Sequence, residues 1–504
     1  MGRILAPLAC LVASASAGAN SLLKHDSFST VHSVSTGCRQ ACSELSSSFG
    51  PAFHWPQNDN FTIWDAKQQE VHPACRVEPS SANDVASILR ILVDHWCYFS
   101  VKGGGHSRNP GDSNSLGGVT VDLDRLSSVD ILEGGTQARV GGGATTIQVY
   151  EALETQNLSF VGGRVGSVGV GGFILGGGTS PFSNKYGWSL DNVYEYEVVL
   201  ANGTITIASE TNNPDLYFAL RGGGNNFGIV TTFTVRAFPQ GPLFTSMTTY
   251  AANQSNQVLE KVYDLWTDEQ LASDKAMGYD LYYTYISESD EFTLSGTQRY
   301  GKAVRSPSVF RSIDRIPTLS RSTSIGPMSQ VVDGTDSMGT TRHLFATLSV
   351  APSRSLLSKG LKIFEEEVEG IKGVAGLIPN FICYPLQKNA IAAMAQRGGN
   401  ALGIDREDPL IIILISTAWS KKSDDVAVNQ MTANVVKRLN ATANDLGVAN
   451  RYKYINYASA AQTSAIFPGY GNKNVERLVS IQKAVDPRGI FTSKGLWRGF
   501  VKLL

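Results

Sequence analysis

The chain has 504 residues, of which 42% are hydrophobic and 17% charged, and its formal net charge is −1. This length allows two to four domains or one large interrupted domain, and the composition is that of a folded protein rather than a disordered one. The near-neutral charge gives no electrostatic reason to expect a nucleic acid or an anionic membrane as partner. Glycine stands out, because 26 of the 50 glycines lie between Gly103 and Gly228.

Residues 1–19 have the layout of a secretory signal peptide. Arg3 gives a positive start, an apolar run covers residues 4–13, and small residues at 15–19 offer cleavage sites. We expect a protein of the secretory pathway, secreted or held in a vesicle or vacuole; an ordinary N-terminal helix is the alternative. No later run predicts a membrane span. Five N-x-S/T sequons are candidate glycosylation sites on this route: Asn60, Asn157, Asn202, Asn253 and Asn440.

Removal of the signal peptide leaves five cysteines, an odd number. In an oxidising compartment this predicts one or two disulfides and a free thiol, with the pairing left open. No CxxC motif and no Cys/His cluster occurs in the sequence, so no metal site is predicted. The five are Cys38, Cys42, Cys75, Cys97 and Cys383.

The first well-patterned stretch predicts a β-α-β unit over residues 75–102. A short strand at 75–78 precedes helix-capping residues at 80–84, apolar residues at helical spacing continue to about residue 95, and residues 98–102 form a second strand. This strand leads directly into three consecutive glycines, 103–105, and then His106.

The following elements alternate with further glycine clusters at 141–143, 162–178 and 222–228. The pattern predicts a strand at 119–123, a hairpin at 129–140, a helix after the second cluster, paired strands at 194–200 and 204–208, a helix at 215–220 and a strand at 229–235. Beyond about residue 240 glycine becomes sparse. Amphipathic helices at 356–371 and 426–446, with a buried strand at 411–417, predict a second, α+β domain.

Glycine-rich turns at strand ends are typical of sites where backbone N–H groups contact phosphate oxygens. The two common nucleotide motifs are missing from this sequence: residues 169–174 depart from G-x-G-x-x-G at the last position, and G-x-x-x-x-G-K-[ST] does not occur. Tight turns in a β-rich core are the plain alternative, but four clusters at the ends of predicted strands favour a cofactor site. His106 could then be a nucleophile, a base or a covalent tether.

Four motifs in this order resemble those of the berberine-bridge-enzyme-like branch of the vanillyl-alcohol-oxidase/p-cresol-methylhydroxylase (PCMH-type) FAD-linked oxidoreductases. They lie at residues 102–111, 162–178, 221–230 and, near the C-terminus, 454–457 with 470–471 and 486–491. The resemblance implies an α+β fold with a two-part PCMH-type FAD-binding domain and an α+β substrate domain built on an antiparallel sheet. It divides the chain into a signal peptide (1–19), an N-terminal segment of the FAD domain (20–68), the FAD-binding domain (69–240), the substrate domain (241–450) and a C-terminal return to the FAD domain (451–504).

The resemblance also implies the roles of particular residues. FAD would be bound covalently through its 8α position to His106, and Tyr457, or in second place Tyr454, would be the catalytic base. A phenol with its usual pKa of ~10 needs a nearby cation or hydrogen bonds to act as a base at neutral pH; aromatic packing is the alternative role of each tyrosine. A Cys38–Cys97 disulfide is implied as well. The remaining residues implied to bind the cofactor are Lys102, Gly103, Gly104, Gly105, Ser107, Gly142, Gly143, Gly166, Ser167, Val168, Gly169, Gly228, Val230 and Asn456.

Two valines of the third glycine cluster refine the expected activity. Val165 stands where doubly linked members have a cysteine, so His106 alone can be the tether, and Val168 matches a position where valine is typical of members that react with O2. These features favour an oxidase that dehydrogenates or oxidatively cyclises a small secondary metabolite by hydride transfer to flavin N5. A secreted carbohydrate oxidase producing H2O2 and a non-catalytic binding protein are the alternatives; Val165 argues against the first, and His106 with Val168 against the second. The sequence identifies neither the substrate nor the oligomeric state.

Overall fold

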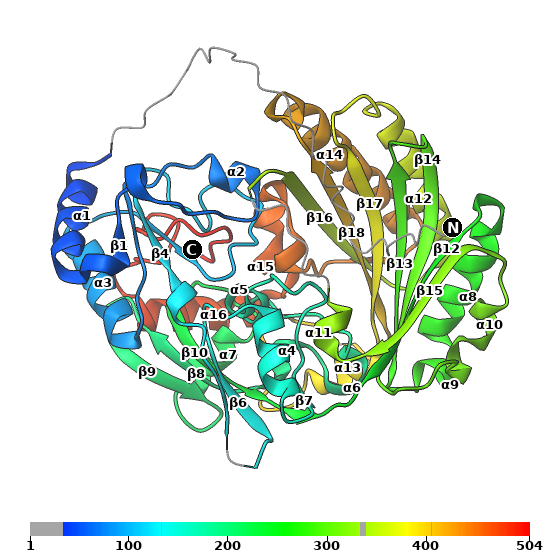
Figure 1. Cartoon of the computed structure of the whole chain (residues 1–504), viewed down its shortest axis with the longest axis horizontal. Helices are drawn as coiled ribbons and strands as arrows, with labels where there is room; N and C mark the ends of the chain where they lie inside the picture. The colour runs from blue at the N-terminus through cyan, green and yellow to red at the C-terminus, as the bar shows by residue number, and fades with distance from the viewer. Residues whose placement is uncertain (1–33, 133, 333–338, 405) are drawn as a thin grey trace, which may run out of the picture.

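The computed structural model describes residues 34–504, apart from 133, 333–338 and 405. The predicted signal peptide and Cys10 therefore lie outside the described residues. Two lobes lie side by side: one contains the N-terminal part of the chain and its C-terminal return, and the other contains a large sheet covered by helices (Figure 1).

The first sheet of the N-terminal lobe has the strand order β1-β2-β4-β3. Strands β2 and β3 both run parallel to β4, which lies between them, and helix α3 is the crossover. The predicted β-α-β unit is thus confirmed, with a strand inserted at its centre. The helix begins where the Ser81 side chain accepts a hydrogen bond from the Asp84 N–H, and it buries one apolar face. The bounds are β1 Phe53–His54, β2 Cys75–Val77, α3 Ala82–Asp94, β3 Phe99–Lys102 and β4 Val119–Asp122.

The second sheet of this lobe is antiparallel, in the order β5-β6-β10-β8-β9. Both predicted hairpins, β5–β6 and β8–β9, are confirmed. A separate two-stranded ribbon pairs β7 with β11. The strands are β5 Val129–Ile131, β6 Gln137–Gly141, β7 Leu158–Ser159, β8 Val193–Val199, β9 Ile205–Ser209, β10 Ile229–Arg236 and β11 Phe238–Pro239; the helices are α2 Ala66–Gln69, α4 Thr146–Glu154, α5 Val170–Leu175, α6 Ser183–Tyr186 and α7 Pro214–Leu220.

The third sheet has eight antiparallel strands in the order β15-β12-β14-β13-β17-β18-β16-β19. It is drawn from residues 243–450, within the 241–450 range expected for the substrate domain. Its strands are β12 Leu243–Tyr250, β13 Met277–Ile286, β14 Glu291–Tyr300, β15 Thr318–Gly326, β16 Arg342–Val350, β17 Ile378–Leu386, β18 Leu410–Trp419 and β19 Ala449–Asn450; its helices are α8 Ser255–Thr267, α9 Glu269–Ala272, α10 Arg311–Asp314, α11 Met328–Val331, α12 Arg354–Glu369, α13 Lys388–Ala393 and α14 Asp425–Asp445.

Alternation along the strands gives the third sheet two different apolar faces. Phe381 and Cys383 of β17 belong to the core beneath helices α8, α12 and α14, whereas Ile382 and Tyr384 belong to the core shared with the N-terminal lobe. This is the two-residue periodicity of a strand buried on both sides. The second face of the sheet therefore points at the glycine-rich half of the chain.

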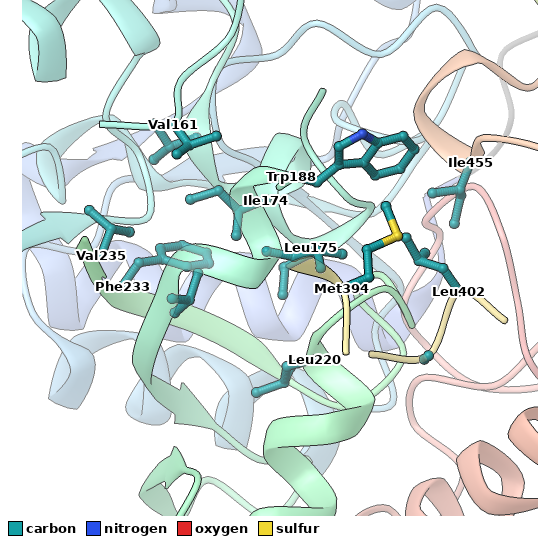
Figure 2. Packing of buried hydrophobic residues seen from close by; sticks show 14 of the residues in the cluster. Val161, Ile174, Leu175, Trp188, Leu220, Phe233, Val235, Met394, Leu402 and Ile455 are labelled. Carbon is teal, nitrogen blue, oxygen red and sulfur yellow. The ribbon is translucent and has the colours of Figure 1, made fainter. Parts of the chain in front are cut away.

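The core between the lobes combines segments that are distant in the sequence. Ile174 and Leu175 from a glycine-rich run pack near Trp188, Met394 and, in the C-terminal segment, Ile455 (Figure 2). Because packed interiors have little free volume, a shared core fixes the two lobes relative to each other.

The C-terminal segment returns to the first sheet. After α15 (Ile466–Gly469) and α16 (Asn472–Val485), the buried Asp486 carboxylate accepts hydrogen bonds from the N–H groups of Ile490 (2.9 Å) and Phe491 (2.7 Å). The chain then runs beside β3, where Phe99 donates to Leu496 and accepts from Arg498 through their backbones. This segment also carries residues 454–457 to the glycine clusters.

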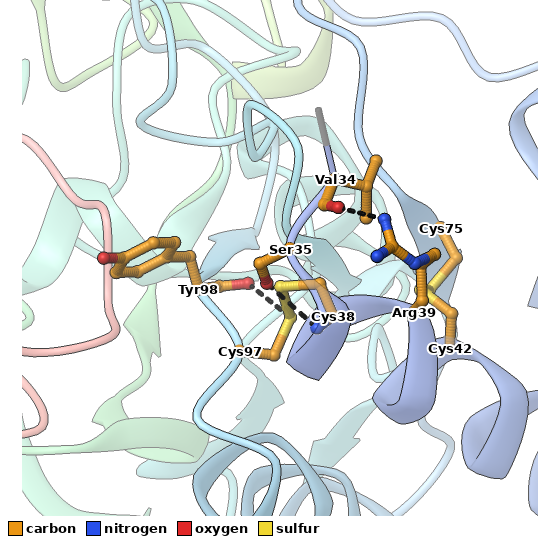
Figure 3. The surroundings of a disulfide bond; sticks show 8 residues. All are labelled: Val34, Ser35, Cys38, Arg39, Cys42, Cys75, Cys97 and Tyr98. Carbon is orange, nitrogen blue, oxygen red and sulfur yellow. Dashed lines mark hydrogen bonds between the residues drawn. A yellow bond between two sulfur atoms is a disulfide. The ribbon is translucent and has the colours of Figure 1, made fainter. Parts of the chain in front are cut away.

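Two disulfides hold the N-terminal helix α1 (Thr36–Phe49) against the first sheet (Figure 3). Cys38 is bonded to Cys97, the pair implied by the family resemblance, and Cys42, one helical turn later, is bonded to Cys75 of β2. Cys383 is a buried free thiol. The bonds join α1 to both ends of the β-α-β unit that leads into the first glycine cluster.

Removing the longer disulfide should destabilise the protein without changing its fold. The Cys38–Cys97 bond spans 59 residues, and a loop of that size predicts that the Cys38→Ser/Cys97→Ser variant loses roughly 2–4 kcal/mol of unfolding free energy. Urea unfolding monitored by tryptophan fluorescence measures this loss. Dithiothreitol should destabilise the native protein more than the variant, and equal unfolding midpoints for the two proteins without reductant would contradict the prediction.

Candidate active site

The glycine clusters meet through their main chains. A Cβ on Gly104 would overlap the backbone nitrogen of Gly169, and a Cβ on Gly169 would overlap that of Gly104. Likewise, a Cβ on Gly142 would lie 2.5 Å from the Val230 carbonyl oxygen, and one on Gly171 would lie 2.8 Å from the Gly142 carbonyl oxygen. Such approaches are possible only for residues without side chains. The clusters are therefore parts of one site.

Backbone amides in the first cluster are available to a ligand. Among the described residues, the N–H groups of Gly103, Gly104 and Gly105 donate to no backbone carbonyl. Consecutive unpaired amides in a loop without side chains are the donor set that binds diphosphate oxygens. In contrast, the N–H groups of Gly142 and Gly143 donate to carbonyl oxygens of other segments at 2.8 and 3.0 Å. These two glycines therefore allow neighbouring segments of the chain to approach closely. The residues present fit a cofactor that carries a diphosphate.

His106 lies at the junction of the first and third clusters. Its Nε2 is 2.8 Å from the Ser167 hydroxyl oxygen, and its ring stacks on Trp64 with 4.2 Å between ring centroids. Burial, reinforced by the charge of Arg108, lowers the pKa of His106 to about 3. The imidazole is therefore neutral at physiological pH, which is its nucleophilic form.

The other face of Trp64 stacks on His343 of β16, with 3.9 Å between ring centroids. The Nδ1 of His343 lies 3.2 Å from a carboxylate oxygen of the fully buried Asp65, which also accepts the His343 backbone N–H at 2.8 Å. His106, Trp64 and His343 thus form one stack of rings, which joins the two lobes. The sequence analysis missed Trp64 and His343, which belong to none of the motifs.

Arg108 connects the His106 loop with the C-terminal segment. Its Nη2 donates to the Asn456 carbonyl at 2.6 Å, its Nη1 donates to the His106 carbonyl at 3.4 Å, and its guanidinium lies 3.9 Å from the centre of the Phe345 ring. Burial lowers the pKa of Arg108 to about 10, so the group keeps its positive charge at neutral pH.

Tyr454, one of the two expected bases, has a hydroxyl that is already engaged. Its oxygen accepts hydrogen bonds from the N–H groups of Gly178 (3.0 Å) and Thr179 (3.3 Å) and from Nδ2 of Asn456 (3.0 Å). The side chain is 1% exposed, and burial raises its pKa despite these donors. These bonds indicate that Tyr454 fixes the glycine turn and Asn456.

Tyr457, the first-ranked base, is placed differently. It is half-buried and packs edge-to-face on Tyr454, with 4.7 Å between ring centroids. Among the described residues no hydrogen-bond partner is found for its hydroxyl, in contrast to that of Tyr454. Burial raises the pKa of the phenol above its usual range, and the charge of Arg164 opposes that rise.

The third sheet adds polar residues that the sequence analysis did not single out. Asp280 of β13 forms ion pairs with Arg164 and with Arg299 of β14. The Arg164 guanidinium lies 4.6 Å from the ring centre of Tyr384, whose own ring lies 5.7 Å from that of Tyr457. Arg164 lies inside a recognised motif, but its partners come from strands without motifs.

The other expected residues occupy supporting positions. The Lys102 ammonium pairs with the Asp122 carboxylate at 2.9 Å, and the Ser107 hydroxyl donates to Asp112, whose pKa burial raises to about 7. Gly228 begins the approach to β10, in which Val230 is buried. Gly166 is buried, whereas Val165 and Val168 are half-buried in the third cluster.

Of the expected glycosylation sites, four are exposed and Asn440 is half-buried in α14; the exposed ones are Asn60, Asn157, Asn202 and Asn253. Within the described residues, no helix has both the length and the apolar character needed to cross a membrane.

Comparison with known proteins identifies the family. The model of a family described as FAD binding domain matches residues 73–209. The chain is 34% identical over 491 residues to the FAD-dependent monooxygenase tpcD of Cochliobolus heterostrophus, covering 90% of this chain and 93% of that protein. The chain belongs to the family of FAD-dependent oxidoreductases that includes this relative. The expected cofactor and general activity are thereby confirmed, and the amides of the first glycine cluster fit the diphosphate of FAD.

Two solved structures share the fold of this chain. Glucooligosaccharide oxidase from Acremonium strictum superimposes with a TM-score of 0.73 and 19% identity, covering 92% of this chain and 100% of that one. A variant of berberine bridge enzyme gives a TM-score of 0.74 and 15% identity, covering 92% and 99%. The expected PCMH-type fold with a mixed α+β organisation is therefore confirmed.

Adding one methyl group at the contact between the glycine clusters should abolish FAD binding. Gly169→Ala forces the first and third clusters apart, and the overpacking should cost roughly 1–3 kcal/mol of stability. The flavin-to-protein absorbance ratio of the purified protein measures cofactor content. Gly172→Ala is the matched control, because no atom lies within 4 Å of a Cβ at that exposed position; full FAD content in both variants would refute the assigned contact.

Proposed function

We propose that this chain is an O2-using oxidase, with FAD tethered through His106 alone, that dehydrogenates or oxidatively cyclises a small secondary metabolite. The observation that carries the proposal is the hydroxyl of Tyr457, for which no hydrogen-bond partner is found among the described residues and which feels the charge of Arg164. The two side chains are linked through the ring of Tyr384. Bound FAD would accept a hydride from substrate carbon at N5 and would be reoxidised by O2 with release of H2O2.

The protein's own groups supply the proton chemistry. Tyr457, after releasing its own proton to solvent, accepts the proton of a substrate hydroxyl or amine. The neighbouring Arg164 charge favours the phenolate form, against the burial that raises the pKa of the phenol. Tyr454 and Asn456 hold the glycine turn beneath Tyr457. His106 enters the tethering reaction as a neutral imidazole, so no proton has to be removed from a cationic ring first.

A single tether distinguishes this chain from the carbohydrate oxidase of similar fold. The Acremonium strictum enzyme is described as carrying 6-S-cysteinyl, 8α-N1-histidyl FAD. Here Val165 occupies the position of the second link, and Cys383, the free cysteine among the described residues, packs on the helix-covered face of β17. These features favour a metabolite oxidase. A carbohydrate oxidase is the second candidate, because the overall fold is shared.

The proposal also places the chain in the secretory pathway, secreted or held in a vesicle or vacuole. Two disulfides in the described residues support an oxidising compartment. The exposed sequons are consistent with the same route.

Acid precipitation tests the tether. The native protein should give a yellow pellet that is fluorescent in a denaturing gel, and His106→Ala should give a colourless one, because only a covalent bond survives unfolding. A colourless native pellet would refute the covalent link.

The reaction is tested with the soluble native enzyme, which should release H2O2 with aromatic alcohols and not with oligosaccharides. Substrate-dependent incorporation of oxygen into the product, with little H2O2, would instead identify the chain as a monooxygenase like its named relatives.

Exchanging the two tyrosines for phenylalanine should separate their roles. Tyr457→Phe removes the proton acceptor and should lower kcat roughly hundredfold or more, with the melting temperature unchanged. Tyr454→Phe removes an acceptor shared by three N–H donors and should mainly lower the melting temperature. Stopped-flow flavin reduction and thermal unfolding measure the two effects; rapid reduction in Tyr457→Phe would exclude it as the base.

A further inference from the structure

Two arginines share one carboxylate where the lobes meet. The Nε of Arg164 lies 3.0 Å from Oδ2 of Asp280, and Nη1 of Arg299 contacts the same oxygen. Among the described residues, Asp280 is the only carboxylate that contacts either guanidinium group. Because both guanidinium groups are permanently protonated, the cluster carries a formal charge of +1. The side chains are 12% exposed in both arginines and 3% exposed in Asp280.

The surroundings do not neutralise this charge. Tyr282, Tyr384 and Tyr457 surround the pair of arginines, and burial raises the pKa of each phenol, so all three are uncharged at neutral pH. The Tyr282 and Tyr384 rings meet edge-to-face, with 6.5 Å between their centroids. A partly desolvated positive charge among aromatic rings is costly unless an anion is supplied.

The position of the arginines also indicates that the anion they bind is part of a molecule in the active site. Arg164 lies three residues before Ser167, whose hydroxyl contacts His106. From Arg164, ring contacts run through Tyr384 to Tyr457. An anion held by the arginines would therefore place the rest of the same molecule against Tyr457 and the His106 loop.

We propose that Arg164 and Arg299 bind a planar oxyanion of the substrate, a carboxylate or an ionised phenol or enol carried by a flat conjugated molecule. Guanidinium groups match planar oxyanions in both geometry and charge, and tyrosine rings supply apolar area for a flat skeleton. The proposal rests on the proposed function, since it names the substrate class of the same site. It selects against neutral oligosaccharides.

Binding of benzoate and of its neutral isostere benzamide to the holoenzyme tests the site. Isothermal titration should show benzoate binding at least tenfold more tightly than benzamide, and 4-nitrophenolate tests the phenolate form. Arg299→Gln should weaken benzoate binding roughly ten- to hundredfold and leave benzamide unchanged. Asp280→Asn raises the formal charge to +2 and should tighten benzoate binding. Arg477→Gln, which removes an exposed ion pair with Asp215, is the matched control.

Equal affinity for benzoate and benzamide in the native enzyme would overturn the proposal, and so would unchanged benzoate affinity in Arg299→Gln together with Asp280→Asn. Circular dichroism identifies a variant that has not folded, and Arg164→Lys, which retains the charge but loses the planar fork, then serves as the second variant, with weaker benzoate binding expected. Failure of the proposed function is seen separately: a colourless acid pellet with intact benzoate binding refutes the tether, whereas a yellow pellet without benzoate preference refutes the oxyanion site.

Discussion

The main-chain contact between Gly104 and Gly169 is the constraint on which the active site depends. The two loops start from different layers of the fold, one at the end of β3 and the other before α5, and they meet because neither residue has a Cβ. Their contact brings the Ser167 hydroxyl to His106 and directs Arg164 toward the third sheet. A side chain at either glycine would separate the loop that carries His106 from the loop that carries Arg164.

Burial divides the ionisable groups of the site into two classes. It keeps His106 and the tyrosines uncharged at neutral pH, because the charged forms of imidazole and phenol are poorly solvated there. Guanidinium groups have a pKa high enough to remain protonated under the same conditions. Positive charge in the site is therefore carried by arginines, while His106 is neutral and Tyr457 holds its own proton, which it must lose before it can accept one from a substrate.

The third sheet takes part in both structure and chemistry through strand periodicity. On β17, Cys383 faces the helices and Tyr384 faces the glycine clusters; on β13, Tyr283 and Tyr282 divide in the same way. A shift of one residue in register would bury the site residues beneath the helices. The apolar core shared by the lobes, including Ile382 and Ile455, holds this register against the FAD-binding half.

The sequence by itself determined the cofactor class and the order of most elements, and it predicts roles for His106 and Tyr457, because all of these are encoded in contiguous motifs and in local periodicity. The β-α-β unit, both hairpins and the long helices of the second domain follow from patterns a few residues long. Only the tertiary structure decided that Tyr454 is engaged by three donors, that Trp64 lies between His106 and His343, and that Arg164 shares Asp280 with Arg299. These partners lie far apart in the chain, and no local signal encodes a contact that arises only when two separately patterned lobes close on a common core.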